Sequence, residues 1–234
     1  SRELPPRGGL FLQAESEMAA MNMVMGASAA GGRVMTSTSG PGFCLKLEAL
    51  AAMTLTRLPA VIVVVMRSGP AFGTMKAAQE DYRMCGNGGY RVVTMAPSDV
   101  QEAASMVYEA FDIADQYRNP VVILADGMIG QMMGAVDFDR MPPRRENLPA
   151  KDWALRGSDA RGGKAQAILF PVGTAHYIEK NIAETELYPA LIANETRVES
   201  IGVEDADIVL AAYGTASRMC RAAMETLKGE LKLG

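Results

Sequence analysis

The sequence is poor in the residues that build disulfide frameworks, metal sites and histidine-based hydrolase sites. It has 3 cysteines and 1 histidine in 234 residues. Cys44, Cys85 and Cys220 are widely separated and show no Cys-x-x-Cys spacing, so neither a disulfide framework nor a zinc or iron–sulfur site is supported. His176 is the one possible base for a Ser/His/Asp triad, and no nucleophile elbow lies near it. The sequence therefore argues against hydrolase chemistry.

Basic clusters and long apolar runs are also missing. The 23 Lys and Arg residues are outnumbered by 27 Asp and Glu residues, and no basic run stands out, which argues against nucleic acid as a partner. The longest apolar strand core, Pro59–Met66, is too short to span a bilayer. The first six residues, Ser1–Pro6, lack the apolar core of a signal peptide. We therefore expect a cytoplasmic chain with no membrane partner.

What the sequence does contain is an alternation of short β-rich runs with longer amphipathic segments. This pattern is typical of an α/β fold, in which a parallel sheet has helices on both faces. We expect strands at Leu10–Gln13, Arg33–Ser37, Ala60–Met66, Arg91–Met95 and Pro120–Ala125. Helices are expected at Ser16–Ala30 and Phe43–Thr56, and a third should begin at a capping box formed by Ser98–Gln101.

The composition also predicts where this domain ends. Residues 1–138 form the α/β domain, and residues 139–200, rich in Pro, Gly and Arg, are interpreted as a linker or insertion. Within residues 201–234, Ala206–Tyr213 is predicted to be a buried strand that is followed by a helix through Leu227. A lone strand and helix bury too little surface to form a domain. We therefore interpret residues 201–234 as the start of a second α/β domain in a shortened chain.

Polar residues follow several of the predicted strands. They are Glu17, the turn Thr38-Ser39-Gly40-Pro41-Gly42, of which Thr38, Ser39 and Gly40 are the candidate residues, and Arg67. Because the carboxyl ends of parallel strands meet at one edge of the sheet, where small ligands bind, these residues are candidates for a site. Each also has a plainer interpretation. Glu17 could complement a helix dipole, the turn could be an ordinary strand-to-helix connection, and Arg67 could be a solvated charge.

Four segments carry a resemblance to a known family. They are Leu10–Glu17, Thr36–Phe43, Met66–Pro70 and Tyr117–Gly127. In order and spacing they resemble the pyrimidine-binding, alpha-type subunit of 2-oxoacid:ferredoxin oxidoreductases, closest to the 3-methyl-2-oxobutanoate (branched-chain) and 2-oxoglutarate members. The resemblance covers residues 7–138, and residues 206–233 are similar to the start of a transketolase C-terminal-like domain.

The resemblance implies a thiamine diphosphate-binding fold and the oxidative decarboxylation of a 2-oxoacid to an acyl-coenzyme A. Glu17 would be catalytic, because a carboxylate bonded to the aminopyrimidine ring favours its reactive tautomer. Arg67 would grip the substrate carboxylate with two parallel hydrogen bonds, which Lys cannot reproduce. Thr38, Ser39 and Gly40 would approach the cofactor together with Glu17.

The same resemblance implies partners. Ala125-Asp126-Gly127 departs from the Gly-Asp-Gly start of the diphosphate-and-magnesium motif, so Asp126 is expected to be structural and this chain to hold no metal. A beta-type subunit would then bind the diphosphate and Mg²⁺. Gamma and ferredoxin-like delta subunits would complete the complex, iron–sulfur clusters would lie in the partner subunits, and ferredoxin would take the electrons. The alternative function is a non-catalytic scaffold subunit of such a complex.

Overall fold

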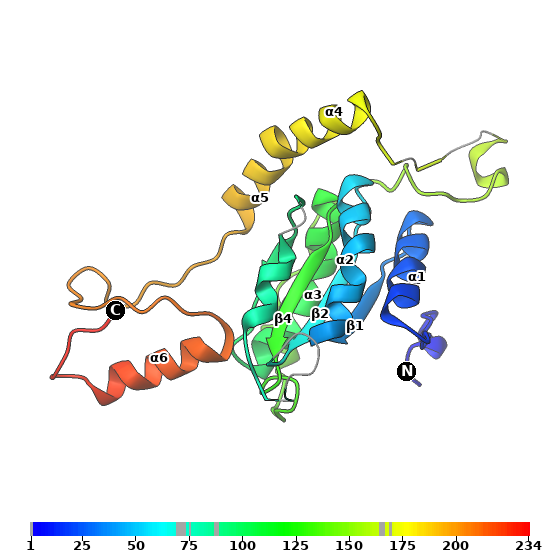
Figure 1. Cartoon of the computed structure of the whole chain (residues 1–234). Coiled ribbons are helices and arrows are strands. Elements are labelled where there is room, and N and C mark those ends of the chain that lie inside the picture. Colours follow the sequence, from blue (N-terminus) through cyan, green and yellow to red (C-terminus); the bar gives the residue numbers. More distant parts are fainter. Residues whose placement is uncertain (1, 69–73, 75, 87–88, 164–166, 169) are drawn as a thin grey trace.

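A computed structural model describes residues 2–68, 74, 76–86, 89–163, 167–168 and 170–234 of the chain (Figure 1). Gly69 and Pro70 of the third resembling segment therefore lie outside the described residues. A parallel sheet forms the centre of the molecule. Its strands are β1 (Met35–Ser39), β2 (Val61–Met66), β3 (Val93–Met95) and β4 (Val121–Asp126). The strand order in space is β1-β2-β4-β3, with every pairing parallel.

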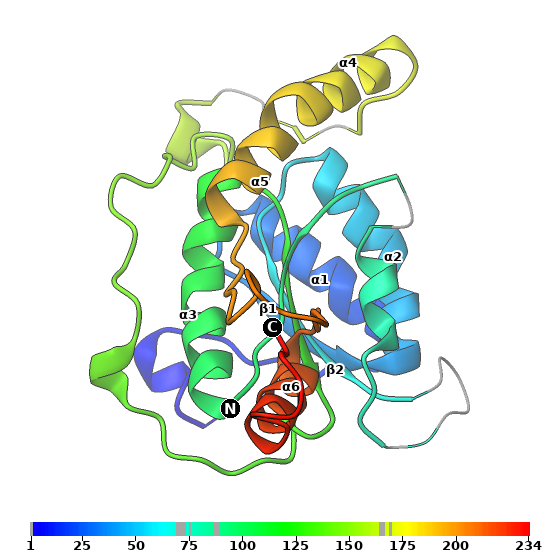
Figure 2. The ribbon, with the colours of Figure 1, turned by 90° about the vertical axis from the view of Figure 1, so that its left-hand side faces the viewer.

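Helices cover both faces of the sheet, as the sequence predicted (Figures 1 and 2). On one face α1 (Glu17–Ala29) and α2 (Gly40–Leu55) pack on alternate residues of β2 and β4, such as Ile62 and Leu124. On the other face α3 (Val100–Tyr117) packs on the residues between them, such as Val61 and Ile123. Successive side chains of a strand point to opposite faces, so a strand buried on both sides is apolar throughout.

The starts of two helices follow from their capping residues. Ser16 caps α1, because its side chain accepts a hydrogen bond from the Ala19 amide. In α3 the capping box lies one residue later than predicted. The Asp99 carboxylate accepts from the Glu102 amide at 2.8 Å, and the Glu102 carboxylate accepts in return from the Ser98 amide at 2.7 Å. The acidic pair outcompetes the neutral Ser98–Gln101 pair because charged acceptors form stronger hydrogen bonds.

Two predicted strands are wrong. Leu10–Gln13 has no regular secondary structure and is exposed, and β1 forms its ladder with β2 and not with this segment. Ala206–Tyr213 is also irregular, and its β-structure is limited to one bridge between Ile208 and Leu233. An apolar run becomes a strand only where a neighbour pairs with its N–H and C=O groups. The helix that follows, α6 (Gly214–Thr226), ends one residue short of the predicted Leu227.

The region interpreted as a linker contains helices that the sequence analysis missed. After short 3₁₀ turns at Phe138–Arg140 and Asp159–Arg161 come α4 (Thr174–Ile182), a π-helical turn (Ala183–Leu187) and α5 (Tyr188–Glu195). Their buried apolar side chains are contributed by Leu187, Tyr188 and Leu191, which pack near β3 and the end of α3. The proposed domain boundaries remain predictions.

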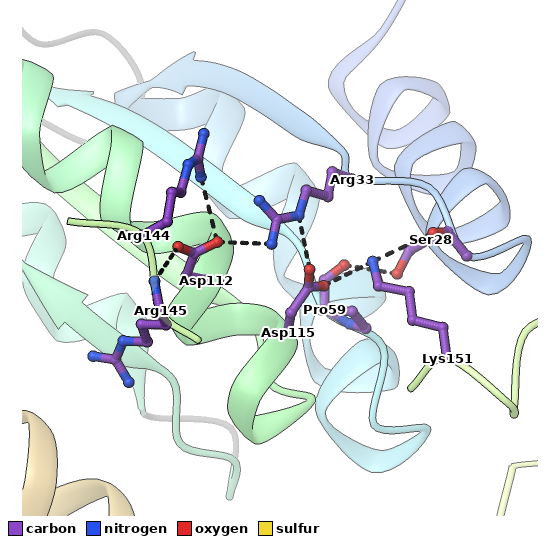
Figure 3. Close-up of polar contacts among 9 residues, drawn as sticks. Ser28, Arg33, Pro59, Asp112, Asp115, Arg144, Arg145 and Lys151 are labelled. Carbon is purple, nitrogen blue, oxygen red and sulfur yellow. Dashed lines mark hydrogen bonds and ion pairs between the residues drawn. The ribbon is translucent and has the colours of Figure 1, made fainter. Parts of the chain in front are cut away.

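Ion pairs fasten the segment after β4 to α3 (Figure 3). Asp112 pairs with Arg33 at 2.7 Å and with Arg144 at 3.3 Å. Asp115 pairs with Arg33 at 2.8 Å and with Lys151 at 2.8 Å. Burial raises the pKa of Asp112, but the Arg145 amide and the Arg33 guanidinium lower it by more, so its pKa lies below the ordinary value. This cluster joins α3 to segments on both sides of it in the sequence.

The start of α6 docks at the carboxyl end of β4. The Thr215 hydroxyl donates a hydrogen bond to the buried carboxylate of Asp126. Next to it, the Gln79 side chain donates to the Tyr213 carbonyl at 2.9 Å, and the Tyr213 hydroxyl donates to the Gln79 carbonyl at 2.6 Å. Of the helices in the described part of the chain, none is both long and apolar enough to cross a membrane.

Candidate active site

Glu17 lies at the carboxyl edge of the sheet, at the first position of α1. Its side chain is half-buried, whereas that of Glu15, two residues earlier, is exposed. The Glu17 carboxylate lies against α2. A Cβ placed on Gly42 would lie 2.7 Å from Glu17 Oε1 and 2.9 Å from its Cγ. Gly42 thus leaves the space that the Glu17 side chain occupies.

Thr38 borders the same space beside Gly42 that the Glu17 side chain occupies. Its hydroxyl oxygen lies even closer to the Cβ position of Gly42, is buried, and finds no hydrogen-bond partner within the described residues. A buried hydroxyl without a partner is uncommon and is costly unless something else satisfies it. Thr38 and Glu17 thus place an unsatisfied hydroxyl and a carboxylate next to each other.

The predicted turn at residues 38–42 is wrong in its secondary structure. Thr38 and Ser39 are the last residues of β1, and α2 begins immediately at Gly40. Such an abrupt change is possible because Gly40 has φ +35°, in the left-handed region that favours glycine. Ser39 occupies the N-cap position of α2, and its side chain makes no capping hydrogen bond. The predicted residues keep their place at the sheet edge, but a strand end and a helix start hold them.

Arg67 follows β2 and lies against Gly40. A Cβ on Gly40 would lie 3.2 Å from Arg67 Nε and 3.4 Å from its Cζ. The guanidinium is half-buried, and it forms no ion pair with any residue in the described ranges. Because β1 and β2 are neighbours in register up to Ser39 and Val65, their ends bring Arg67 beside the start of α2. The structure thus gathers all five predicted site residues at one edge of the sheet.

Asp81 is a residue of this edge that the sequence analysis missed. It lies in a 3₁₀ helix (Glu80–Cys85) and is 4% exposed. Burial raises the pKa of Asp81, and the backbone amides of Arg67 and Gly40 partly oppose that rise. Its Oδ2 finds no partner in the described part of the chain. Nothing in the local sequence distinguishes Asp81 from a surface acid, because its burial depends on residues distant in the chain.

Lys46 is the second missed residue, and it lies one turn after Gly42 on α2. It is 1% exposed, and its ammonium donates to Thr36 Oγ1 at 2.9 Å and to the Glu17 carbonyl at 3.4 Å. Burial lowers the pKa of Lys46, and the Glu17 charge partly opposes this. The sequence did hold a signal. Lys46 has the helical spacing of the apolar residues Phe43, Leu50 and Met53 and therefore belongs to the buried face of α2.

Asp126 has the structural contacts that the sequence analysis expected. One carboxylate oxygen accepts from the amides of Met128 and Ile129, each at 3.0 Å, and the other accepts from Thr215. The carboxylate thus fixes the turn after β4 and the start of α6. No cluster of three or more His, Cys, Asp or Glu side chains suited to a metal ion occurs among the residues with described positions.

Comparisons with known proteins show which proteins this chain resembles. Residues 2–161 match the family model described as "Pyruvate flavodoxin/ferredoxin oxidoreductase, thiamine diP-bdg". The ketoisovalerate oxidoreductase subunit VorB of Methanothermobacter marburgensis is 44% identical over 240 residues, covering 100% of this chain and 67% of the relative. The 2-oxoglutarate synthase subunit KorA of Methanocaldococcus jannaschii is 42% identical over 137 residues, covering 56% of this chain and 37% of that subunit.

A solved structure is similar over nearly the whole chain. It is the 2-oxoglutarate:ferredoxin oxidoreductase from Magnetococcus marinus with 2-oxoglutarate, coenzyme A and succinyl-CoA bound. The TM-score is 0.75 at 26% sequence identity, and the match covers 98% of this chain and 45% of the solved chain. This chain therefore spans about two thirds of the length of the ketoisovalerate relatives and under half of the solved chain.

Proposed function

This chain belongs to the pyruvate flavodoxin/ferredoxin oxidoreductase family, in its thiamine diphosphate-binding part, and we propose that it provides the aminopyrimidine side of a 2-oxoacid:ferredoxin oxidoreductase active site. The proposed reaction is the oxidative decarboxylation of a 2-oxoacid to an acyl-coenzyme A, with electrons passed to ferredoxin. The relatives named for ketoisovalerate and 2-oxoglutarate support a branched-chain 2-oxoacid or 2-oxoglutarate as the substrate.

The observation that carries the proposal is the contact of Glu17 with Gly42. The missing Cβ leaves room for a carboxylate beside the buried, unsatisfied Thr38 hydroxyl. These groups suit the polar edge of an aminopyrimidine ring, which needs a carboxylate at a ring nitrogen. When bound, thiamine diphosphate supplies the carbon nucleophile and the electron sink of the reaction. Glu17 would hold the proton at the ring nitrogen, and the backbone of Ser39 and Gly40 would face the cofactor.

Arg67 would bind the carboxylate of the 2-oxoacid. Its guanidinium lies over Gly40, next to the strand end that carries Thr38, so substrate and cofactor would meet over the start of α2. A planar guanidinium can form two parallel hydrogen bonds with a carboxylate and so fix its direction as well as its position. This would orient the 2-oxo carbon toward the cofactor.

The remaining functions would come from other subunits. A beta-type subunit would hold the diphosphate and Mg²⁺, since the Asp126 carboxylate is occupied by Met128, Ile129 and Thr215. Gamma and ferredoxin-like delta subunits would complete the complex, and iron–sulfur clusters in the partners would conduct electrons to ferredoxin. Coenzyme A would accept the acyl group.

The test is the Glu17→Gln substitution in the complete complex. We expect kcat for 2-oxoacid oxidation to fall by roughly two to four powers of ten, because acid–base function is lost, with little change in KM. Glu15→Gln is the matched control, since Glu15 is exposed and lies two residues away. Turnover of Glu17→Gln at the parent rate would overturn the proposal and favour a non-catalytic scaffold.

A further inference from the structure

The buried ammonium of Lys46 has no role in the function proposed so far. Its side chain lies between α1, α2 and β1, where the other inward residues of α2 are apolar, such as Phe43 and Leu50. Removing an ammonium from water is unfavourable by several kcal/mol unless polar groups compensate. Because a methionine of similar length would fill this position without that penalty, a lysine here indicates a use for its charge or its donors.

The contacts of Lys46 lead to Glu17. The ammonium donates to the backbone carbonyl of Glu17 at 3.4 Å and to Thr36 Oγ1 at 2.9 Å, and it forms no ion pair with a residue in the described ranges. Burial lowers the pKa of Lys46, and the negative charge of Glu17 partly opposes that fall. Lys46 is therefore bonded to the backbone of Glu17, the first residue of α1.

Gly42 and Lys46 lie on the same face of α2, and both contact Glu17. Residues four apart on a helix are neighbours on its surface, so the gap at Gly42 and the ammonium of Lys46 lie one above the other. Gly42 leaves the space into which the Glu17 carboxylate fits, and Lys46 holds the backbone to which that side chain is attached. One turn of α2 therefore provides both the space for the Glu17 carboxylate and the hydrogen bond to the Glu17 backbone.

We propose that Lys46 is a positioning residue for Glu17, which it holds through the hydrogen bond from its ammonium to the Glu17 carbonyl. This inference rests on the proposed function, because it assigns Lys46 a role only through Glu17. Lys46 would touch neither the substrate nor the cofactor.

The experiment is a double-mutant cycle in the complete complex, with the Lys46→Met and Glu17→Gln variants alone and combined. We expect Lys46→Met to lower kcat by about 10- to 100-fold, because a displacement of about 1 Å in a catalytic group has an effect of that size. The KM for 2-oxoacid should change less than about threefold, since Arg67 is untouched. In the Glu17→Gln background the same substitution should change kcat by less than about threefold, because the two residues act as a unit.

Two further measurements separate positioning from a purely structural role. The exchange of the acidic ring proton of bound thiamine diphosphate with deuterium, followed by NMR without 2-oxoacid, should slow by the same factor as kcat. The thermal midpoint should not fall, because an apolar side chain replaces a buried charge. Lys151→Met is the matched control. It removes the ion pair with Asp115 far from Glu17 and should lower the midpoint while leaving kcat unchanged.

The outcomes are distinct. If Glu17→Gln turns over at the parent rate, the proposed function itself is wrong. If Glu17→Gln is slow but Lys46→Met matches the parent, or if the two effects simply multiply, only the role of Lys46 is overturned. The role of Lys46 would also be overturned if Lys46→Met lowered both kcat and the thermal midpoint while the rate of proton exchange stayed unchanged. Should Lys46→Met fail to assemble, Lys46→Gln, which keeps a neutral donor, is tested against the same criteria.

Discussion

Gly42 and Glu17 fit one another across the interface of α1 and α2. A Cβ on Gly42 would lie 2.7 Å from Glu17 Oε1, a distance that real Cβ atoms essentially never show. The absence of a side chain in the first turn of α2 therefore determines where the carboxylate at the start of α1 lies. Since Thr38 Oγ1 borders the same position, one methyl group added at residue 42 would disturb two of the proposed cofactor contacts.

The first prediction is that Gly42→Ala lowers the kcat of the complete complex without unfolding this chain. The added methyl should displace the Glu17 carboxylate and lower kcat by about 100-fold, with an overpacking penalty of about 1–3 kcal/mol in the free energy of unfolding. Steady-state kinetics and urea denaturation measure the two effects. Gly26→Ala is the control, because nothing lies within 4 Å of its Cβ position on α1. It should leave kcat unchanged and stabilise the helix by about 0.5–1 kcal/mol.

The second prediction concerns substrate binding by Arg67. Arg67→Lys keeps the positive charge but loses the two-pronged geometry, so we expect the affinity for 2-oxoacids to fall by about 1.5–3 kcal/mol while kcat changes little. The dependence of the rate on 2-oxoacid concentration shows the change. Arg221→Lys serves as a control, because Arg221 is half-exposed and pairs with Glu199 on the surface. Equal substrate affinity in Arg67→Lys and the parent would remove Arg67 from the substrate site.

The third prediction is a loss of stability in acid that depends on Asp112. Burial raises the pKa of Asp112, but the Arg145 amide and the Arg33 guanidinium lower it by more. A lowered pKa in the folded state stabilises the protein fully above the unfolded-state pKa of about 3.9, and this stabilisation is lost as the pH falls through the folded-state pKa. The free energy of unfolding should therefore decrease below about pH 4.

Asp112→Asn tests this prediction. The variant should be less stable near neutral pH by about 1–3 kcal/mol, and its stability should depend less on pH in the acidic range. Urea denaturation at a series of pH values provides the comparison. Asp205→Asn is the control, because Asp205 is highly exposed and pairs only with Lys232 in the described part of the chain. Identical acid profiles for Asp112→Asn and the parent would contradict the prediction.

The fourth prediction separates structural and metal-binding roles of Asp126. Asp126→Asn keeps an oxygen for the amides of Met128 and Ile129 but places an amide group against the Thr215 hydroxyl. We expect a loss of about 1 kcal/mol in stability and no change in the Mg²⁺ concentration that supports half-maximal activity. Thr215→Val should give a similar loss of stability. A tenfold increase in the Mg²⁺ requirement of Asp126→Asn alone would make Asp126 a metal ligand.

The sequence predicts elements well where a local pattern is sufficient. The continuous apolar run of β2 requires burial on both faces, and the spacing of apolar residues on α2 indicates which side faces the core. Prediction fails where a segment forms a strand only if a distant segment of the chain lies beside it and pairs with its backbone. Leu10–Gln13 is as apolar as a strand, yet no described strand pairs with it.

In the candidate site too, some residues could be predicted from a local pattern, whereas others depend on groups distant in the sequence. Thr38 and Arg67 could be placed at one edge because parallel strands end together. Glu17 lies at the same edge for a different reason, since no described strand precedes it and the capped start of α1 places it against Gly42. Lys46 and Asp81 could not be assigned to it, because a charged residue is buried by groups that are close only after folding. Asp81, for example, lies against the amides of Gly40 and Arg67, which are far from it in sequence. The helices α4 and α5 were missed for a similar reason, since Tyr188 and Leu191 find their packing partners on β3 and α3.

The strand order has a consequence for how the chain folds as it is synthesised. Among the described residues β3 pairs with β4 alone, and β4 follows it in the sequence after the whole of α3. When residues 93–95 leave the ribosome, β4, their pairing partner in the described sheet, has not yet been made. β1 and β2 can pair early, but the sheet grows outward to β3 only after β4 has joined β2. Of the four described strands, the last to be synthesised thus completes the sheet from its middle.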